Sequence, residues 1–333
     1  MITDKPSVMT QIQRLGKAMF LLLFMATSCI DEDLSRCGQN YSISYQLKLS
    51  LSLQETFDKE FITADEQALA AKLRTDLSSV LSDRAKLMDL SFFKAQSGKL
   101  EKHNRIMPNA NETSLTVYMK RGEYYNVALA ATNEVSSTVN IQDASSYSGI
   151  RLRQADADTI DAYSSAIYMG LELITMAQKD DRFFVPLYMV NSVPVLVINT
   201  ASSSAKVLYT YVQGTATGLQ CSDSTFTYNN PSVMRTRCTE TGSLEAYHCV
   251  CFPSPNATTK SDDGLWRMDV YTRTADNKYV KNVLDIKEPL LAGNMLVIKA
   301  FLKDDGTITT DSPEVGVSVE LDWNPGGDFD IEM

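Results

Sequence analysis

Apolar and polar residues alternate along one long segment near the start of the chain, from residue 41 to residue 54. Successive side chains of a β-strand point to opposite faces, so this alternation predicts a strand with one buried face. We expect the strand to run from Tyr41 to Leu53. Its buried face would carry Tyr41, Ile43, Tyr45, Leu47, Leu49, Leu51 and Leu53.

A short helix is predicted soon after this strand. Thr63 and Glu66 have the spacing of a capping box, in which each side chain accepts a hydrogen bond from the backbone N–H of the other residue. Leu69 and Leu73 follow at helical spacing, which extends the predicted helix to about residue 82.

The remainder of the chain reads mainly as strands joined by tight turns. Asp263-Gly264 and Asp305-Gly306 place Asp-Gly pairs where a hairpin must reverse. Residues 284–292 are a candidate for a second short helix. Near-regular strand spacing predicts a mainly β protein built from antiparallel sandwiches. The expected strands are 87–94, 114–120, 123–131, 165–175, 182–190, 193–199, 205–213, 224–229, 244–252, 265–273, 278–284, 294–303 and 314–323.

The length of 333 residues predicts two domains at roughly 150 residues each. Two prolines, Pro186 and Pro194, bracket a short connecting segment between expected strands. We therefore place an N-terminal β-sandwich domain at 41–189, which includes the short helix, and a C-terminal β-sandwich domain at 190–333.

The N-terminus has the features of a lipoprotein signal peptide, predicted to span residues 1–28. Basic residues precede an apolar run of nine residues, Ala18–Ala26, whereas a membrane-spanning helix needs about 20. The small residues before Cys29 resemble a bacterial lipobox, in which the cysteine receives covalent lipid such as palmitate. Residues 29–40 would then be a lipidated acidic tether. The alternative is a plain signal peptide with an incidental cysteine.

The charge balance argues against nucleic-acid binding. The chain has 31 Lys and Arg against 41 Asp and Glu, a formal charge of -10, which repels a phosphate backbone. Only two histidines occur, His103 and His248. The sequence contains no nucleophile elbow, dinucleotide fingerprint, P-loop or zinc-protease motif. We therefore predict a non-enzymatic protein with no catalytic, cofactor-binding or metal-binding residues, and covalent lipid as its only attached group.

Paired carboxylates offer one alternative, because such pairs can carry out glycoside hydrolysis. The doublets are Asp180-Asp181, Asp262-Asp263 and Asp304-Asp305. The last two are followed by glycine, which favours hairpin turns over catalysis.

Five cysteines follow Cys29, as expected for an oxidising compartment. An odd number cannot pair completely within one chain, and the sequence alone does not give the connectivity. Cys221 and Cys238 flank a polar loop and are one candidate bridge. Cys249 and Cys251 would share a strand face, so one of them could instead pair with Cys37. The candidate disulfide cysteines are Cys37, Cys221, Cys238, Cys249 and Cys251.

Several segments, taken in order along the chain, resemble one known family. The chain is similar to the Bacteroidetes type V fimbrial anchor and accessory lipoproteins of the FimB type, which are Mfa-like. The resemblance covers nearly all of the chain after the signal peptide. It rests on Cys29–Cys37 before a long first strand, Leu90–Lys94, Ser97–Leu100, Gly122–Ala130 and Gly316–Met333. The acidic residues after Cys29 also resemble the signal that exports such lipoproteins to the outer surface, although a solvated tether would look the same.

The resemblance implies two tandem transthyretin-like sandwich domains in a pilus whose subunits join by donor-strand exchange, a form of β-augmentation. An anchor subunit would keep its lipid and its first strand, and would hold fimbrial subunits at the cell outer membrane. A host or bacterial surface ligand is a further candidate partner. Two alternatives remain open: a polymerising pilin or tip subunit that loses its first strand, and a carbohydrate-binding surface lipoprotein.

Overall fold

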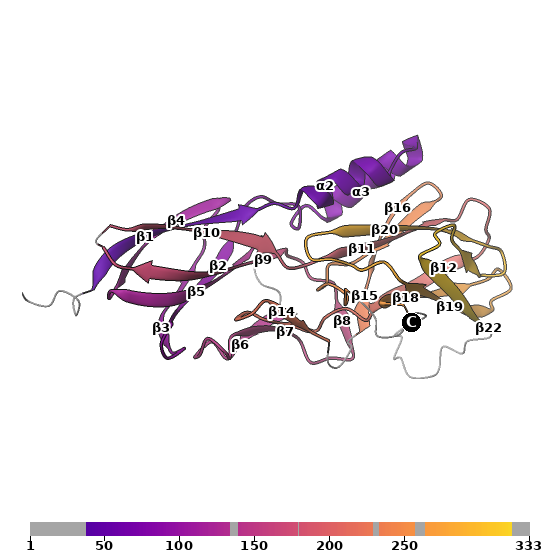
Figure 1. Ribbon diagram of the computed structural model, residues 1–333. Helices are drawn as coiled ribbons and strands as arrows, with labels where there is room; N and C mark the ends of the chain where they lie inside the picture. Colours follow the sequence, from indigo (N-terminus) through magenta and orange to yellow (C-terminus); the bar gives the residue numbers. More distant parts are fainter. Residues whose placement is uncertain (1–37, 134–138, 179, 229–232, 257–263, 322–333) are drawn as a thin grey trace, which may run out of the picture.

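The protein is described here from a computed structural model, which defines residues 38–133, 139–178, 180–228, 233–256 and 264–321. Two β-rich lobes follow one another along an elongated molecule, with a pair of helices lying along one side (Figure 1). The predicted signal peptide, Cys29, Cys37 and most of the acidic tether lie outside the described residues. Within these ranges no helix is both long and apolar enough to cross a membrane.

The first strand, β1 (Gln39–Lys48), ends earlier than predicted. The chain turns and forms helix α2 (Leu51–Glu60), followed by α3 (Ala64–Asp76). The expectation of strand as far as Leu53 is therefore wrong. Leu53 belongs to a helical pattern instead. Leu53 and Phe57 lie four residues apart and are both buried on one face of α2. The prediction of a single helix is also wrong, since two are present.

Seven strands form the first lobe, in the order β3-β2-β5-β9-β10-β1-β4. Strands β9 and β10 pair at only two positions, where the sheet folds over into two layers. Gly170 in β9 allows this close crossing, because a Cβ there would lie 2.6 Å from the carbonyl oxygen of Pro186. The strands besides β1 are β2 (Leu87–Lys94), β3 (Leu100–Ile106), β4 (Glu112–Met119), β5 (Gly122–Ala131), β9 (Ile167–Met176) and β10 (Arg182–Met189).

Two sheets form the second lobe. Their orders are β16-β17-β11-β20-β21 and β22-β19-β18-β12-β15-β8. The first contains β11 (Val193–Asn199), β16 (Arg237–Thr241), β17 (Leu244–His248), β20 (Met295–Leu302) and β21 (Ile308–Thr309). The second contains β8 (Thr159–Asp161), β12 (Lys206–Gln213), β15 (Val233–Arg235), β18 (Trp266–Arg273), β19 (Tyr279–Ile286) and β22 (Val315–Leu321).

A small third sheet lies between the lobes, in the order β14-β13-β7-β6 (Figure 1). It joins strands that are distant in sequence, because β7 pairs with β13. Strand β8 likewise pairs with β15, and α3 contacts β16 and β17. The division at residues 189 and 190 falls between β10 and β11, yet several elements pair across it, so these domain limits stay a prediction. The strands of the third sheet are β6 (Val139–Gln142), β7 (Arg151–Gln154), β13 (Gly218–Gln220) and β14 (Thr225–Thr227).

The predicted mainly β, tandem-sandwich architecture is confirmed, and a strand is present at each position expected from residue 87 onward. Most differ by one or two residues at their ends, but the strand expected at 244–252 ends at His248 and the one expected at 224–229 is only Thr225–Thr227. Most pairings are antiparallel, but β1–β10, β11–β20 and β15–β8 are parallel. No helix forms at 284–292, because β19 continues to Ile286. Sequence patterns missed β3, whose residues are mostly polar and charged. They also missed the short strands β6, β7, β8, β13, β15, β16 and β21.

Candidate strand-addition site

Strand β1 occupies the middle of one layer of the first lobe. It pairs in parallel with β10 on one side and antiparallel with β4 on the other. Tyr41, Ile43, Tyr45 and Leu47 point into the lobe, and none of them is more than 5% exposed. The slot between β10 and β4 is therefore filled by the chain's own first strand.

Polar groups also line this slot. Burial raises the pKa of Tyr45, and the neighbouring Asn126 of β5 opposes part of that shift. Asn126 is fully buried and donates its side-chain amide to the carbonyl oxygen of Ser91, at 3.3 Å. A buried polar group that loses its hydrogen-bond partner raises the free energy of the folded state. A shift in the register of β1 would separate such partners, so the slot favours the observed register.

The segment that follows β1 is fixed to the second lobe. The Ser50 and Ser52 hydroxyls, at the start of α2, both donate to the carbonyl oxygen of Gly293, which precedes β20. Ser52 also donates to the side-chain oxygen of Asn294 at 2.7 Å. The chain cannot leave the end of β1 freely, because these contacts hold it within a few residues of the strand.

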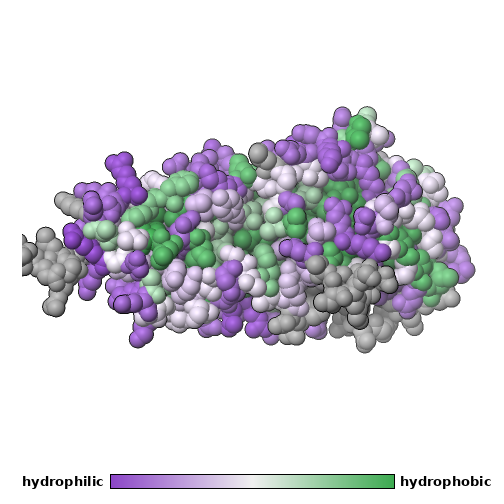
Figure 2. Space-filling model, viewed as in Figure 1, coloured by the Kyte–Doolittle hydropathy of each residue, from purple (hydrophilic) through white to green (hydrophobic). Residues whose placement is uncertain are grey.

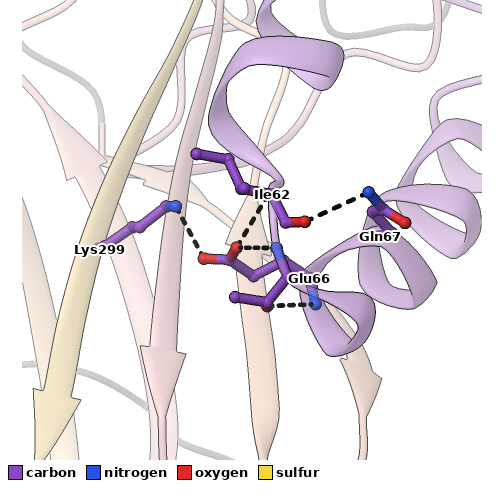
Figure 3. Close-up of polar contacts among 5 residues, drawn as sticks. Ile62, Glu66, Gln67 and Lys299 are labelled. Carbon is purple, nitrogen blue, oxygen red and sulfur yellow. Dashed lines mark hydrogen bonds and ion pairs between the residues drawn. The ribbon is translucent and has the colours of Figure 1, made fainter.

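Glu66 makes the second attachment, at the N-terminus of α3 (Figure 3). Its carboxylate accepts from the backbone N–H groups of Ile62 and Thr63, both at 2.9 Å, and forms an ion pair of 2.7 Å with Lys299 of β20. Burial disfavours the charged carboxylate, but the hydrogen bonds from Lys299 and from these two N–H groups outweigh it and lower the pKa of Glu66 to about 2. The capping box predicted from sequence is confirmed, and the ion pair makes it an attachment between α3 and the sheet.

A third attachment joins the other end of α3 to β16 and β17. The Thr239 hydroxyl donates to the Asp76 carboxylate and lies 3.1 Å from Nε2 of His248. Burial lowers the pKa of His248 to about 4, although the nearby Asp76 opposes the shift. His248 is therefore neutral at pH 7 and takes part in a buried polar contact.

The outer edges of the sheets differ in how they are protected against strand pairing. Among the described residues, the four edge strands β6, β8, β14 and β21 have at most four residues each, and β3 and β16 carry charged side chains. Short length and charge both discourage edge-to-edge pairing. Strand β4 is longer, and its exposed side chains are polar except for Tyr118. Strand β22 is the last strand of its sheet and has Glu320 as its one charged residue.

The edge of β22 is apolar and unpaired among the described residues. Val319 is 40% exposed and Leu321 is 65% exposed. In Figure 2 apolar surface is visible at the end of the molecule where β19 and β22 lie. Exposed apolar edge strands of this length are templates for a further strand. We therefore identify β22 as the candidate site at which another chain adds a strand.

The register of β22 shows which of its N–H groups are free to pair. Lys287 donates its N–H to the carbonyl oxygen of Glu314 at 2.9 Å, so these two residues form a hydrogen-bonded pair. Such pairs alternate along an antiparallel ladder. With the observed register, the N–H groups of Val317, Val319 and Leu321 face away from β19.

The cysteines do not form the bridge suggested by their spacing. Cys221, Cys238, Cys249 and Cys251 are free thiols, and Cys238 is the exposed one. Cys221 follows β13 of the third sheet and is buried, whereas Cys238 lies on β16 of another sheet and is exposed. Cys249 and Cys251 are both fully buried beside the connection between β10 and β11. A pairing with Cys37 concerns a residue outside the described ranges.

The remaining candidate chemistry is sparse in the described parts of the chain. Across those ranges no three His, Cys, Asp or Glu residues are grouped so that they could hold a metal ion. Asp304 accepts hydrogen bonds from the backbone N–H and the hydroxyl of Ser204, and the nearby Asp305 accepts from Thr307. Asp305 therefore stabilises its own turn, as the following glycine indicated, and Asp304 connects this turn to the loop at Ser204.

Comparison with known proteins identifies the fold. No protein-family profile matches the chain, and no curated protein matches it. A candidate adhesin from Bacteroides ovatus shares 12% identity over 90% of this chain and 100% of its own, with a TM-score of 0.53. A candidate polysaccharide-binding protein from Bacteroides thetaiotaomicron shares 12% identity over 83% and 97%, with a TM-score of 0.51. The chain has the fold of these proteins.

The structural neighbours also include a fimbrial protein. The fimbrial anchor protein Mfa2 from Porphyromonas gingivalis shares 9% identity over 85% of this chain and 99% of its own, with a TM-score of 0.47.

Proposed function

We propose that this protein is a non-enzymatic subunit of a surface fimbria, an anchor or accessory lipoprotein held in the cell outer membrane through lipid on Cys29. One observation carries the proposal: β1 fills its own slot and is attached on both sides, while the apolar edge of β22 is open. Such a subunit can receive or dock a neighbour without giving up its first strand.

The attachments after β1 favour this role over that of a polymerising pilin. A pilin that exchanges its first strand must release that strand from the slot. Here the segment after β1 enters α2 almost at once, and Ser52, Glu66 and Thr239 connect α2 and α3 to the second lobe. The first strand is thus held by its own pairing and by the helices that follow it.

The lipid attachment is tested by removing the acceptor thiol. Cys29→Ala should release the protein, together with the fimbriae it holds, from the outer membrane into the medium. Cys238→Ala is the matched control, because Cys238 is an exposed thiol that is not expected to carry lipid. Fimbriae retained on Cys29→Ala cells in unchanged number and length would refute the anchor role.

The fate of β1 is tested by determining the N-terminus of the protein on cells. We expect the surface protein to begin at Cys29 and to retain Tyr41–Lys48. A mature N-terminus beyond residue 53 would assign the chain to the polymerising class.

Docking at β22 is tested with a proline. Val319→Pro removes an N–H that faces away from β19, so the ladder to β19 can persist while the free edge loses a donor. We expect Val319→Pro to capture less fimbrial subunit in pull-downs from the cell surface than Val319→Ala, which keeps the N–H. Equal capture by the two variants would exclude β22 as the docking edge.

A specific feature also favours glycan binding as a second candidate function. Phe184 and Tyr188 of β10 and Tyr118 of β4 are all more than half exposed. They flank an outward face of small hydroxyl side chains on β1 and β4, and aromatic rings beside hydroxyl groups suit stacking against sugars. A glycan array with the Tyr188→Ala variant tests this: a ligand whose signal is lost in the variant would support the function, and an array without signal would remove it.

A further inference from the structure

A cavity of about 340 Å³ lies between the outer face of the first lobe and the third sheet. This volume is within the range of small-ligand sites. Its floor is formed by β2, β5 and β9, whose outer face is apolar at this point. The apolar floor residues are Leu87, Leu129, Ala130, Ala131 and Ile167.

Charged and polar groups form one wall of the cavity. Asp89 of β2 lies opposite Arg105 of β3, and Nε2 of His103 is 2.8 Å from the Asp89 carboxylate. This hydrogen bond orients His103, and the Arg105 guanidinium at the cavity wall has no ion pair among the described residues. The wall therefore combines fixed polar groups with a cationic side chain beside an apolar floor.

The roof of the cavity is held by both halves of the chain. Leu152 of β7 and Ile141 of β6 point into the cavity, and Leu152 pairs with Leu219 of β13. Tyr147, between β6 and β7, stacks on Tyr125 of the first lobe with ring centroids 4.1 Å apart. These contacts make the roof a fixed structural element.

We propose that this cavity binds a small amphipathic carboxylate, with its apolar body against the floor and roof and its carboxylate at Arg105. Guanidinium and carboxylate form charge-assisted hydrogen bonds, and apolar lining with a few polar groups is typical of small-ligand sites. A void left by imperfect packing would be lined by apolar groups alone, whereas this one has an arginine and a histidine–aspartate pair in its wall. None of the residues that line the site belongs to β22.

Decanoate is a direct probe, because it has a flexible apolar chain and one carboxylate. The full chain carrying Cys29→Ala is titrated calorimetrically without detergent. Decanoate should bind saturably with one site per chain, decanol at least tenfold more weakly, and acetate not at all. Absence of decanoate binding at millimolar concentration would overturn the proposal. Equal affinity for decanoate and decanol would also overturn it, because the carboxylate would then contribute nothing to binding.

Substitutions locate the binding in the cavity. Arg105→Gln should weaken decanoate binding at least tenfold, because it removes the charged partner. Arg153→Gln is the matched control, since Arg153 lies next to Leu152 in β7 and so on the opposite face of the roof. Unchanged binding in Arg105→Gln would reject the assignment.

A filling substitution tests the volume itself. Ala144→Trp introduces a large ring from the partly exposed roof, and Ala131→Trp does so from the buried floor. Each variant should unfold at a temperature close to that of the parent and bind no decanoate. If either variant folds and still binds decanoate as tightly as the parent does, the ligand lies outside this cavity.

Discussion

Strands β1 and β22 have the same alternating sequence pattern but opposite surroundings. In β1 both edges are paired and its apolar side chains are enclosed between two layers. In β22 one edge pairs with β19, and Val319 and Leu321 remain exposed. Alternation shows which side chains share a face, whereas the sheet order determines whether that face and both edges are covered. The comparison leads us to expect that substitutions in β1 change stability, whereas substitutions on the free edge of β22 do so only slightly.

The largest expected difference is in stability. Ile43→Ala removes buried methyl and methylene groups from a fully buried position, which should lower the free energy of unfolding by about 2–5 kcal/mol. Val319→Ala, at the half-exposed edge, should change it by less than about 0.5 kcal/mol. Urea denaturation of both variants measures this, and similar losses would contradict the contrast between the two strands.

The attachment of α3 should weaken in mild acid. Unfolded histidine takes up a proton near pH 6.5, whereas His248 in the folded protein does so near pH 4. The unfolded state therefore binds more protons between these values, and stability falls as the pH falls through this window, by up to about 3 kcal/mol at 1.36 kcal/mol per pKa unit. We expect unfolding curves of His248→Gln to show a smaller loss over the same range. A parallel pH dependence in parent and variant would refute this role.

The ion pair between α3 and β20 should contribute less. Glu66→Gln keeps an oxygen that can cap the helix but loses the charge opposite Lys299, so we expect a loss of about 1 kcal/mol at pH 7. Because the pKa of Glu66 is lowered to about 2, the contribution is complete above about pH 4.5 and disappears as the pH falls toward 2. Denaturation across this range measures the difference, with Glu55→Gln on the exposed face of α2 as control. A gap between Glu66→Gln and the parent that persists at pH 2 would exclude the charge as its cause.

The smallest effect on stability is expected at the open edge. Val319→Lys should leave the free energy of unfolding within about 0.5 kcal/mol of the parent, because the side chain is partly in solvent already. An edge lysine nevertheless opposes strand pairing, so sedimentation at high concentration should show less association than in the parent. Association that is unchanged by the lysine would show that this edge does not take part in it.

Much of the fold could be predicted from the sequence, because the apolar patterns identified β1 and most of the longer strands that follow it. The helix α2 was missed because Leu47, Leu49, Leu51 and Leu53 fit an alternating pattern. The spacing of Leu53 and Phe57 distinguishes a helix from a strand only once both side chains are known to be buried on the same face. Strand β3 was missed because it has few apolar residues.

The candidate site was less predictable, because it depends on contacts between distant segments. Residues 314–323 were expected to form a strand, but only the sheet order shows that β22 is at an edge. The cavity lies under β6 and β7, and β7 pairs with β13, which is far away in the sequence. The spacing of Cys221 and Cys238 suggested a bridge, yet both are free thiols, one buried and the other exposed.

The two-sided pairing of β1 has a mechanical consequence. A pull on the N-terminal end of β1 acts along the strand, so the hydrogen bonds to β10 and β4 are loaded together in shear. A strand paired on one side and pulled away from its neighbour would instead open one bond at a time. Forced unfolding is governed by the unfolding rate. A chain tethered through its N-terminus would thus carry tension on a strand that is paired along both of its edges.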